Sequence, residues 1–266
     1  MYTFLRSHII TIELTMSNYF NWFYYLFLLF NDELDPDNDI GIIGGKPVKI
    51  EEVPFFAIYR NKNSKHGCGA TIVSDQFLIS AAHCYGALKN PEIVVGTDKI
   101  NEGERYDILE AYPHPPTSNG LDYDVVVIKL AKKLVFSSKV QPLKLAERDM
   151  VVEDDAVFKV IGFGDTDPGT PSNELLQVDV PYVKDEECKE FYHNITDVNI
   201  TPRMICAGLK GKGACFGDSG GPLIYQNKHI GIVSFGTRDC SLTTGSPTVY
   251  ARVSALRDFI DEQMAK

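Results

Sequence analysis

Short runs of β-branched and aromatic residues recur along most of the chain, and this rhythm limits the fold more than any other feature. Each run has the length and composition of a strand, and the Gly, Pro, Asn and Asp residues between runs favour turns. The runs are residues 70–73, 77–80, 93–95, 125–130, 156–161, 175–180, 223–225, 230–235 and 248–253. The pattern predicts an all-β barrel or sandwich. Because the run 125–130 is nearly all apolar, we expect it to be buried on both faces.

The C-terminal end departs from this rhythm. Leu256, Phe259, Ile260 and Met264 recur at intervals of three or four residues, which is the spacing of one face of a helix. We predict one amphipathic helix over residues 254–264, with Ser254 as its N-cap.

The first 41 residues differ again. Residues 19–30 form a continuous apolar run, shorter than the roughly 20 residues that cross a bilayer. Residues 1–30 therefore resemble a secretory signal segment, with Met16 as an alternative start, although a buried strand or helix is the other interpretation. Residues 31–41 are acidic and polar and predict a short disordered pro-segment. Residues 42–266 remain as the folded domain.

The charge balance excludes some partners. The 266-residue chain has a net charge of −10, which disfavours nucleic acid. Residues 1–41 hold one of the 26 basic residues and six of the 36 acidic ones, so much of the excess lies outside the predicted domain. We expect no nucleic-acid partner and no membrane association once the signal segment is removed.

Six cysteines are scattered through the chain, and none has a zinc-like spacing. An even number suits three disulfides in a secreted protein, but counting leaves fifteen pairings open. Glu102, Glu104 and Asp107 are close in sequence, yet their spacing gives no convincing ligand set. We predict no metal and no other cofactor.

The stretch Gly217–Pro222 has the features of a nucleophile loop. Glycines around Ser219 leave room for its hydroxyl, with backbone N–H groups beside it. His83 follows small residues and precedes a cysteine, so it is a candidate base. Asp124 precedes the apolar run 125–130 and could orient that base, whereas we expect Asp122 to be solvated.

Three segments, Ser80–Cys84, Asp122–Leu130 and Gly217–Pro222, carry these residues in the order His, Asp, Ser. Together they resemble the chymotrypsin-like serine proteases. The overall character is similar to arthropod digestive members, including mite allergens. The resemblance runs from residue 42 to the C-terminus. It implies two packed antiparallel six-stranded β-barrels with a C-terminal α-helix.

The resemblance also implies roles. Ser219 would be the nucleophile, His83 the general base and then acid, and Asp124 the orienting carboxylate. The N–H groups of Gly217 and Ser219 would form the oxyanion hole. We expect the mature protein to be a secreted, monomeric serine endopeptidase that cleaves proteins or peptides. An inactive homologue acting as a binding or decoy protein is the alternative.

The segment Ile42–Gly45 resembles the mature N-terminus of this family. Cleavage would free an α-amine at Ile42 that pairs with Asp218, so the intact chain would be a zymogen. Gly41 precedes this site, and we therefore expect an activating protease that does not cut after Arg or Lys. The disulfides implied by the resemblance are Cys68–Cys84, Cys188–Cys206 and Cys215–Cys240.

Substrate choice is read from the expected pocket. Trypsins have Asp at the pocket floor, where this chain has Gly213. Ser234, Phe235 and Gly236 resemble the segment that pairs with substrate backbone, with Phe235 where Trp is usual. Thr248 is expected in the pocket wall. We predict cleavage after large apolar or aromatic residues, with an elastase-like preference as the alternative.

Two further predictions concern the surface. Lys212 lies next to the floor position and is expected to be a solvated loop residue. Asn194 and Asn199 begin glycosylation sequons, five residues apart.

Overall fold

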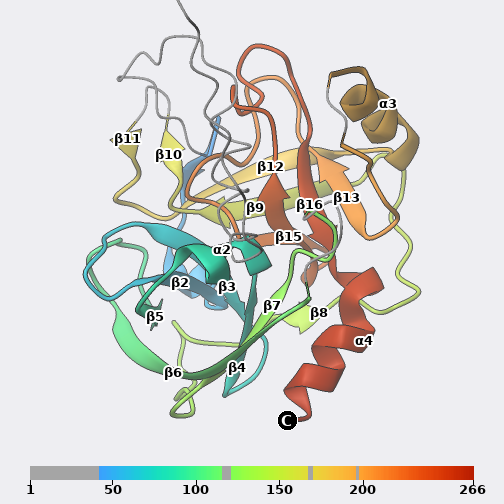
Figure 1. Ribbon diagram of the computed structural model, residues 1–266. Coiled ribbons are helices and arrows are strands. Elements are labelled where there is room, and N and C mark those ends of the chain that lie inside the picture. The colour runs from blue at the N-terminus through green and yellow to red at the C-terminus, as the bar shows by residue number, and fades with distance from the viewer. Residues whose placement is uncertain (1–41, 116–120, 167–169, 196–197) are drawn as a thin grey trace, which may run out of the picture. The chain divides into compact units, whose positions relative to one another are not determined.

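The computed structural model describes residues 42–266 except 116–120, 167–169 and 196–197 (Figure 1). The predicted signal segment and pro-segment, residues 1–41, lie outside the described residues. Within the described part of the chain, no helix is long and apolar enough to span a membrane.

The first half of the described chain forms a closed barrel of six antiparallel strands. Its strand order is β2-β3-β4-β7-β6-β5. The strands are β2 (Phe56–Asn61), β3 (Gly67–Ile72), β4 (Phe77–Ser80), β5 (Pro91–Val95), β6 (Glu104–Pro113) and β7 (Val126–Leu130). Helix α2 (Ala82–Ala87) follows β4 directly, and a short 3-10 turn, η2 (Ile50–Glu52), precedes β2.

The second half forms another six-stranded barrel, which closes where β12 pairs with β9. Around the ring the strands are β9 (Val157–Gly162), β12 (Leu176–Val183), β13 (Met204–Ala207), β16 (Thr248–Arg252), β15 (Lys228–Phe235) and β14 (Pro222–Tyr225). Strand β1 (Lys46–Pro47) extends the sheet beside β12, and β8 (Lys144–Leu145) pairs in parallel with β15. Strands β10 (Asp165–Thr166) and β11 (Thr170–Pro171) form a separate pair.

This architecture confirms the predicted fold class of two antiparallel barrels and a C-terminal helix. Each of the nine predicted runs overlaps a strand. The run 125–130 is buried as expected except at Lys129, whose ammonium group reaches the C-terminal carbonyl of Lys266 at 3.0 Å.

Three core strands, β2, β6 and β13, and two helices were not predicted. Strand β2 contains Arg60, which is buried because its guanidinium group donates to Glu92 and to the carbonyl of Ile100. Helix α3 (Asp185–Ile195) buries only Cys188 and Tyr192, so few apolar residues mark its buried face. Pairing with distant partners decided these elements.

The C-terminal helix corrects one prediction. Helix α4 (Val253–Met264) has Arg252 as its N-cap, and no side chain caps it, so Ser254 is not the N-cap. Strand β16 ends at Arg252 and continues directly into the helix, and the buried Val253 becomes its first residue. The chain therefore turns one residue earlier than the side-chain pattern suggests.

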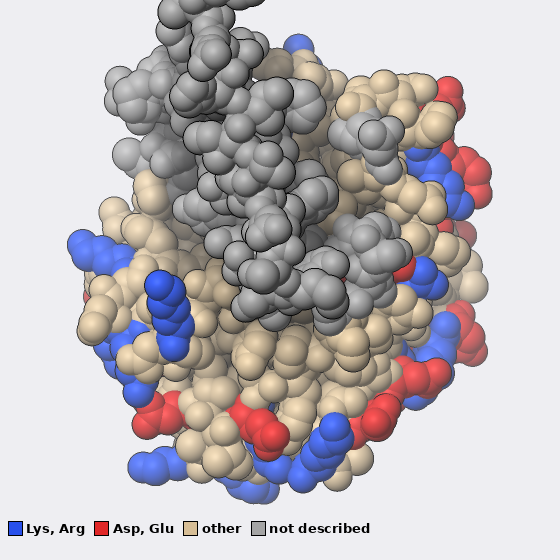
Figure 2. Space-filling view, viewed as in Figure 1, with Lys and Arg blue, Asp and Glu red and all other residues tan. Residues whose placement is uncertain are grey.

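Charged side chains of both signs are visible on one face of the molecule (Figure 2). On the face shown in Figure 2, acidic and basic residues alternate along the lower edge of the molecule. The described residues visible on this face form no basic patch of the kind that binds nucleic acid.

Candidate active site

His83 and Asp124 meet at the rim of the first barrel. Strand β4 and the small residue Ala81 deliver His83 to the first turn of α2, and Asp124 ends the loop before β7. His83 Nδ1 lies 2.7 Å from Asp124 Oδ2, and the backbone N–H of His83 donates to Asp124 Oδ1 at 3.0 Å. Ser234 Oγ from β15 donates to the same carboxylate at 2.5 Å. The carboxylate is only 6% exposed, so its orientation is fixed by three donors.

These contacts set the charge of the pair. Burial alone would lower the pKa of His83, but the Asp124 charge and its hydrogen bond outweigh burial and raise the pKa above its ordinary value. Burial alone would raise the pKa of Asp124, but the His83 and Ser234 contacts hold it below its ordinary range. The arrangement thus favours an ionised Asp124 and stabilises a protonated His83.

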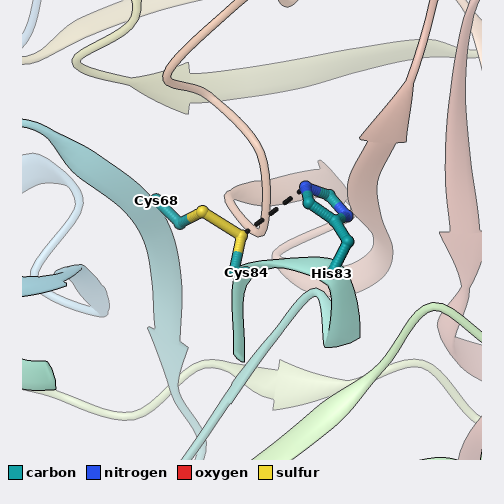
Figure 3. Close-up of side chains that lie close together, drawn as sticks. All are labelled: Cys68, His83 and Cys84. Carbon is teal, nitrogen blue, oxygen red and sulfur yellow. Dashed lines mark hydrogen bonds between the residues drawn. A yellow bond between two sulfur atoms is a disulfide. The ribbon is translucent and has the colours of Figure 1, made fainter. Parts of the chain in front are cut away.

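A disulfide lies against the imidazole. Cys68 in β3 is bonded to Cys84 in α2, and Cys84 Sγ lies 3.6 Å from His83 Nε2 (Figure 3). The three side chains gather potential metal-ligand atoms. Both sulfurs are consumed in the disulfide, however, so they cannot act as thiolate ligands. The cluster anchors the helix that carries His83.

Glycines let the Ser219 loop pack against the first barrel. The N–H of Gly69 in β3 donates to the carbonyl of Ser219 at 2.8 Å. A Cβ on Gly69 would lie 2.7 Å from Gly221 Cα, and one on Gly220 would lie 2.2 Å from Ser80 Oγ. Such contacts are too short for a real side chain, so only glycine allows this approach.

Two backbone N–H groups of this loop are unused. The N–H groups of Asp218, Gly220 and Gly221 all donate to carbonyl oxygens of the protein. Those of Gly217 and Ser219 donate to no group among the described residues. Gly217 has φ of +90°, and a Cβ there would meet Gly164 Cα at 3.1 Å. The loop therefore presents two free donors on either side of Asp218.

The structure does not pair the serine with the histidine. Among the described residues, Ser219 Oγ has no hydrogen-bond partner, and His83 Nε2 faces Cys84 Sγ instead. In unliganded enzymes this contact is often long and tightens only around substrate.

Asp218 is completely buried beneath the loop. Its carboxylate accepts the N–H groups of Gly164 at 2.8 Å and of Cys215 at 3.0 Å. A Cβ on Gly162 or Gly164 would lie 2.0–2.4 Å from its oxygens, so both positions require glycine. These bonds hold the Cys215–Ser219 turn.

The segment after residue 41 lies close to the pocket floor. Ile42 is 2% exposed, and the N–H of Ile43 donates to the carbonyl of Gly213 at 2.9 Å. Ile43, next to the proposed new N-terminus at Ile42, is thus hydrogen bonded directly to Gly213, the predicted pocket floor.

Hydroxyl groups surround the floor position. The nearest atoms to a Cβ on Gly213 would be Ser241 Oγ at 3.3 Å and Thr248 Oγ1 at 3.4 Å. Thr248 Oγ1 donates to the carbonyl of Ala214, and Ser241 Oγ donates to that of Ser246. Lys212, in contrast, is exposed, as predicted. The Thr248 and Ser241 hydroxyls thus already donate hydrogen bonds to protein carbonyls, and neither places a charge beside Gly213.

The remaining predicted wall residues lie on β15 and just beyond it. The Phe235 ring packs edge-to-face against Tyr192 of α3, with ring centroids 5.7 Å apart. Among the described residues, a Cβ on Gly236 would touch only Thr248, at 3.9–4.0 Å, so the space beside Gly236 is open. Phe163, which follows β9, packs against Phe56 of the first barrel.

A cavity of about 400 Å³ lies on the other side of the Ser219 loop. Gly217 and the half-exposed Phe216 belong to its lining. The first barrel contributes Phe56, Ile58 and the segment 66–69. Gly217 therefore borders a hollow lined by residues of both barrels.

Comparison with known proteins decides the family. The Trypsin family profile matches residues 42–260. The chain belongs to the trypsin family of serine endopeptidases. It is 35% identical over 227 residues to Trypsin 5G1 of Aedes aegypti, covering 83% of this chain and 84% of that protein.

Two other relatives of this trypsin-family protease have different names. Vitellin-degrading protease of Bombyx mori is 35% identical over 236 residues, covering 86% of this chain and 88% of that protein. Granzyme B of Rattus norvegicus is 33% identical over 253 residues, covering 91% and 98%. The predicted family is confirmed, and its arthropod character agrees with the insect relatives.

The structure of the protease confirms all three disulfides that the resemblance implied. Besides Cys68–Cys84, Cys188 of α3 is bonded to Cys206 of β13, and Cys215 to Cys240. The last of these joins the Ser219 loop to the segment beyond β15.

One prediction for the protease was wrong. Asp122 is buried rather than solvated, because Arg203 and Thr201 from the second barrel bind its carboxylate. Burial would raise the pKa of Asp122, but these hydrogen bonds and the Arg203 charge hold it below its ordinary value.

Asp239 was overlooked in the sequence. Its carboxylate accepts hydrogen bonds from Thr237, Thr243 and Thr244 in the segment between Phe235 and Thr248. Burial would raise the pKa of this carboxyl, but the hydrogen bonds hold it far below its usual range. The signal was an Asp in a threonine-rich turn.

Proposed function

We propose that the protein is a secreted endopeptidase that hydrolyses peptide bonds through an acyl-enzyme on Ser219. His83 accepts the Ser219 proton and returns it to the leaving amine, while Asp124 holds Nδ1 and stabilises the imidazolium. The observation that carries the proposal is the pair of unused N–H groups at Gly217 and Ser219. A tetrahedral oxyanion needs such donors, and the N–H groups of Asp218, Gly220 and Gly221 in the same loop are engaged.

The experiment begins with protein whose N-terminus is confirmed as Ile42. A serine-directed phosphonate should form one adduct, located at Ser219 by peptide mass spectrometry. Ser219→Ala is the matched control and should remain unlabelled. If correctly processed protein forms no adduct at Ser219, the catalytic assignment fails and the binding-protein alternative is favoured.

We propose cleavage after large apolar or aromatic residues. An Arg or Lys side chain entering the pocket would meet Gly213 and two satisfied hydroxyls rather than a carboxylate. Stripping a cation of water without a partner is costly, which disfavours the tryptic specificity after which some relatives are named. Peptide-library cleavage tests this, and turnover of Arg substrates equal to that of Phe substrates would refute it.

An elastase-like preference is the second candidate, and Thr248 favours it. This side chain is buried and directs Oγ1 toward the Gly213 position, where it would shorten the pocket. Apolar size discrimination is worth about 1–3 kcal/mol, so we expect broad preferences. The same library distinguishes the two candidates by the ratio of Phe to Ala at the cleaved position.

We also propose that the chain is made as a zymogen. The buried Ile42, the Ile43–Gly213 hydrogen bond and the buried Asp218 support insertion of a new α-amine next to Asp218. Because Gly41 precedes the site, an activator of non-tryptic specificity is expected. Incubating the precursor with trypsin and sequencing the new N-terminus tests this, and clean release at Ile42 would contradict it.

The mature protein is proposed to be a secreted monomer. Asn194 and Asn199 are exposed, which is compatible with glycosylation, but Thr201 Oγ1 of the second sequon donates to Asp122. Peptide mapping after glycosidase treatment checks both asparagines.

A further inference from the structure

The residue before Asp124 has an unusual backbone. Tyr123 has φ of 59°, the left-handed region that bulky residues rarely adopt. Its carbonyl accepts the N–H of Val125 at 2.7 Å, so the turn is tight on both sides of Asp124. A conformation of this kind persists only where its surroundings impose it, and such residues cluster at functional sites.

The Tyr123 side chain is enclosed on two sides. The His114 ring stacks on it with ring centroids 4.2 Å apart and planes 15° apart. The Arg203 guanidinium carbon lies 4.5 Å from the Tyr123 ring centroid. His114 is itself held edge-on by Phe259 of α4, at 4.8 Å. The ring is therefore fixed by residues from three separate parts of the chain.

Arg203 also binds Asp122, the residue that precedes Tyr123. Its Nε donates to Asp122 Oδ1 at 2.9 Å and to Oδ2 at 3.1 Å, and its Nη2 donates to Oδ2 as well. Thr201 Oγ1 donates to the same carboxylate at 3.0 Å, and so does the N–H of Tyr123 at 3.1 Å. The Asp122 side chain is 6% exposed and that of Arg203 31%, so the carboxylate is shielded from solvent while the guanidinium group stays partly exposed.

Arg203 belongs to the second barrel. Its carbonyl accepts the N–H of Arg252, where β16 ends, at 2.7 Å. One guanidinium group thus binds Asp122 and covers Tyr123, while the backbone behind it is tied to the other barrel. The residue that follows Tyr123 in the sequence is Asp124.

We propose that Arg203 is a positioning residue for catalysis. Together with Asp122 it holds Tyr123 in its left-handed conformation, and this directs the Asp124 carboxylate at His83. The inference rests on the proposed function, because it assigns Arg203 a role in the same reaction. It also means that the second barrel controls the orientation of the acid–base pair carried by the first.

The test compares Arg203→Met with Arg252→Met. Arg252 makes a similar ion pair, with Nη2 at 2.6 and 2.7 Å from the Asp185 oxygens, and its Nε donates to the carbonyl of Met204, but its side-chain contacts among the described residues include none of residues 122–124. For Arg203→Met we expect kcat to fall about 10- to 100-fold with KM unchanged, the cost of misplacing a reacting group. Arg252→Met should lower the melting temperature but keep kcat.

A spectroscopic readout separates positioning from stability. The His83 Nδ1 proton, shared with Asp124, should give a low-field proton NMR signal in the wild-type protein. Arg203→Met should shift or broaden this signal, while Arg252→Met should leave it in place. Arg203→Lys restores one charged donor and should recover part of both kcat and the signal.

Two further outcomes keep the inference falsifiable. If Arg203→Met does not fold, Tyr123→Ala replaces it, since Ala neither fills the sandwich nor favours the left-handed conformation; kcat should still fall. A folded Arg203→Met or Tyr123→Ala with wild-type kcat and an unchanged signal would overturn the role. Absence of any Ser219 adduct in the wild type would instead refute the proposed function, and the NMR signal would still report on Arg203.

Discussion

The two barrels supply the site with different kinds of groups. The first barrel contributes side chains, His83 and Asp124, held by hydrogen bonds and by the Cys68–Cys84 disulfide. The second contributes mostly backbone: free N–H groups at Gly217 and Ser219 and an empty floor at Gly213. Through side chains it contributes the Ser219 hydroxyl, the wall residues, and the Ser234 and Arg203 contacts to Asp124 and Asp122.

This difference indicates how each half can fail. A side chain is lost by replacing it, whereas a backbone donor is lost when its loop moves. Activity that depends on the acid–base half, His83 and Asp124, should therefore respond to changes in charge and hydrogen bonding. Activity that depends on the oxyanion half, the N–H groups of Gly217 and Ser219, should respond to changes in side-chain volume and backbone φ.

Asp124→Asn should give the largest effect. Members of this family lose about 10⁴-fold in kcat with this change, because the imidazole no longer has the correct tautomer. We expect the same here, with the fold retained, in a steady-state assay on an apolar peptide substrate. A loss below tenfold would mean that the first barrel does not work through this side chain.

Gly217→Ala tests the backbone half. A Cβ there would sit 3.1 Å from Gly164 Cα on a residue with φ of +90°, so the peptide must move. Loss of one oxyanion donor costs about 10²–10³-fold in kcat. Gly96→Ala is the matched control, with φ of +75° in the first barrel, and should lower stability while sparing kcat. Equal activity of both variants would argue against an oxyanion role for Gly217.

The pH dependence isolates the acid–base half. The raised pKa of His83 means that it gains a proton, and can no longer act as a base, at a pH above its ordinary 6.5. We expect kcat/KM to decline about tenfold per pH unit below that pKa. A pH–rate profile from pH 5 to 9 checks this, and a midpoint below 6.5 would show that Asp124 does not support the imidazolium.

Thr248→Gly sharpens the account of the pocket. Removing this side chain should deepen the pocket and raise the Phe to Ala ratio of kcat/KM about tenfold. Thr97→Gly, a change at a buried threonine of the first barrel, is the control and should leave the ratio unchanged. An unchanged ratio in Thr248→Gly would place the specificity limit elsewhere in the wall.

His229→Leu should affect stability alone. His229 is fully buried in β15, and burial lowers its pKa to about 3 despite the Gly231 carbonyl, so it stays neutral in the fold. Below pH 6.5 the unfolded chain takes up a proton that the fold cannot, and stability falls as pH drops toward 3. In His229→Leu, the free energy of unfolding should therefore depend less on pH than in the wild type, by up to about 1.4 kcal/mol per pH unit.

Urea unfolding at pH 4, 5 and 6 measures the slope. His193→Leu, at an exposed position of α3, is the control. Identical slopes in His229→Leu and the wild type would show that His229 does not sense acid.

The strands that could be predicted from the sequence are those in which apolar residues follow one another closely in the sequence. Residues 77–80 match β4, because each of its four side chains is buried. Strand β6 could not be recognised, since its exposed residues interrupt the pattern and a bulge between Ile108 and Glu110 breaks the register. Partners distant in sequence decide such elements.

The candidate site divides in the same way. His83, Asp124 and Ser219 could be identified because their chemistry belongs to the residue type and their motifs are short. The burial of Asp122 could not be foreseen, because Arg203 lies 81 residues away and a carboxylate beside a turn is usually solvated.

The sequence by itself determined the family, the candidate reacting groups and the uncharged residue at the proposed pocket floor, since each of these depends on which side chains exist. The tertiary structure decided which backbone N–H groups remain free, how closely the Ser219 loop meets β3, and that the second barrel grips Asp122. These are consequences of packing between distant segments, where hydrogen bonds already made leave Gly217 and Ser219 unused and a guanidinium group fills the space beside Tyr123.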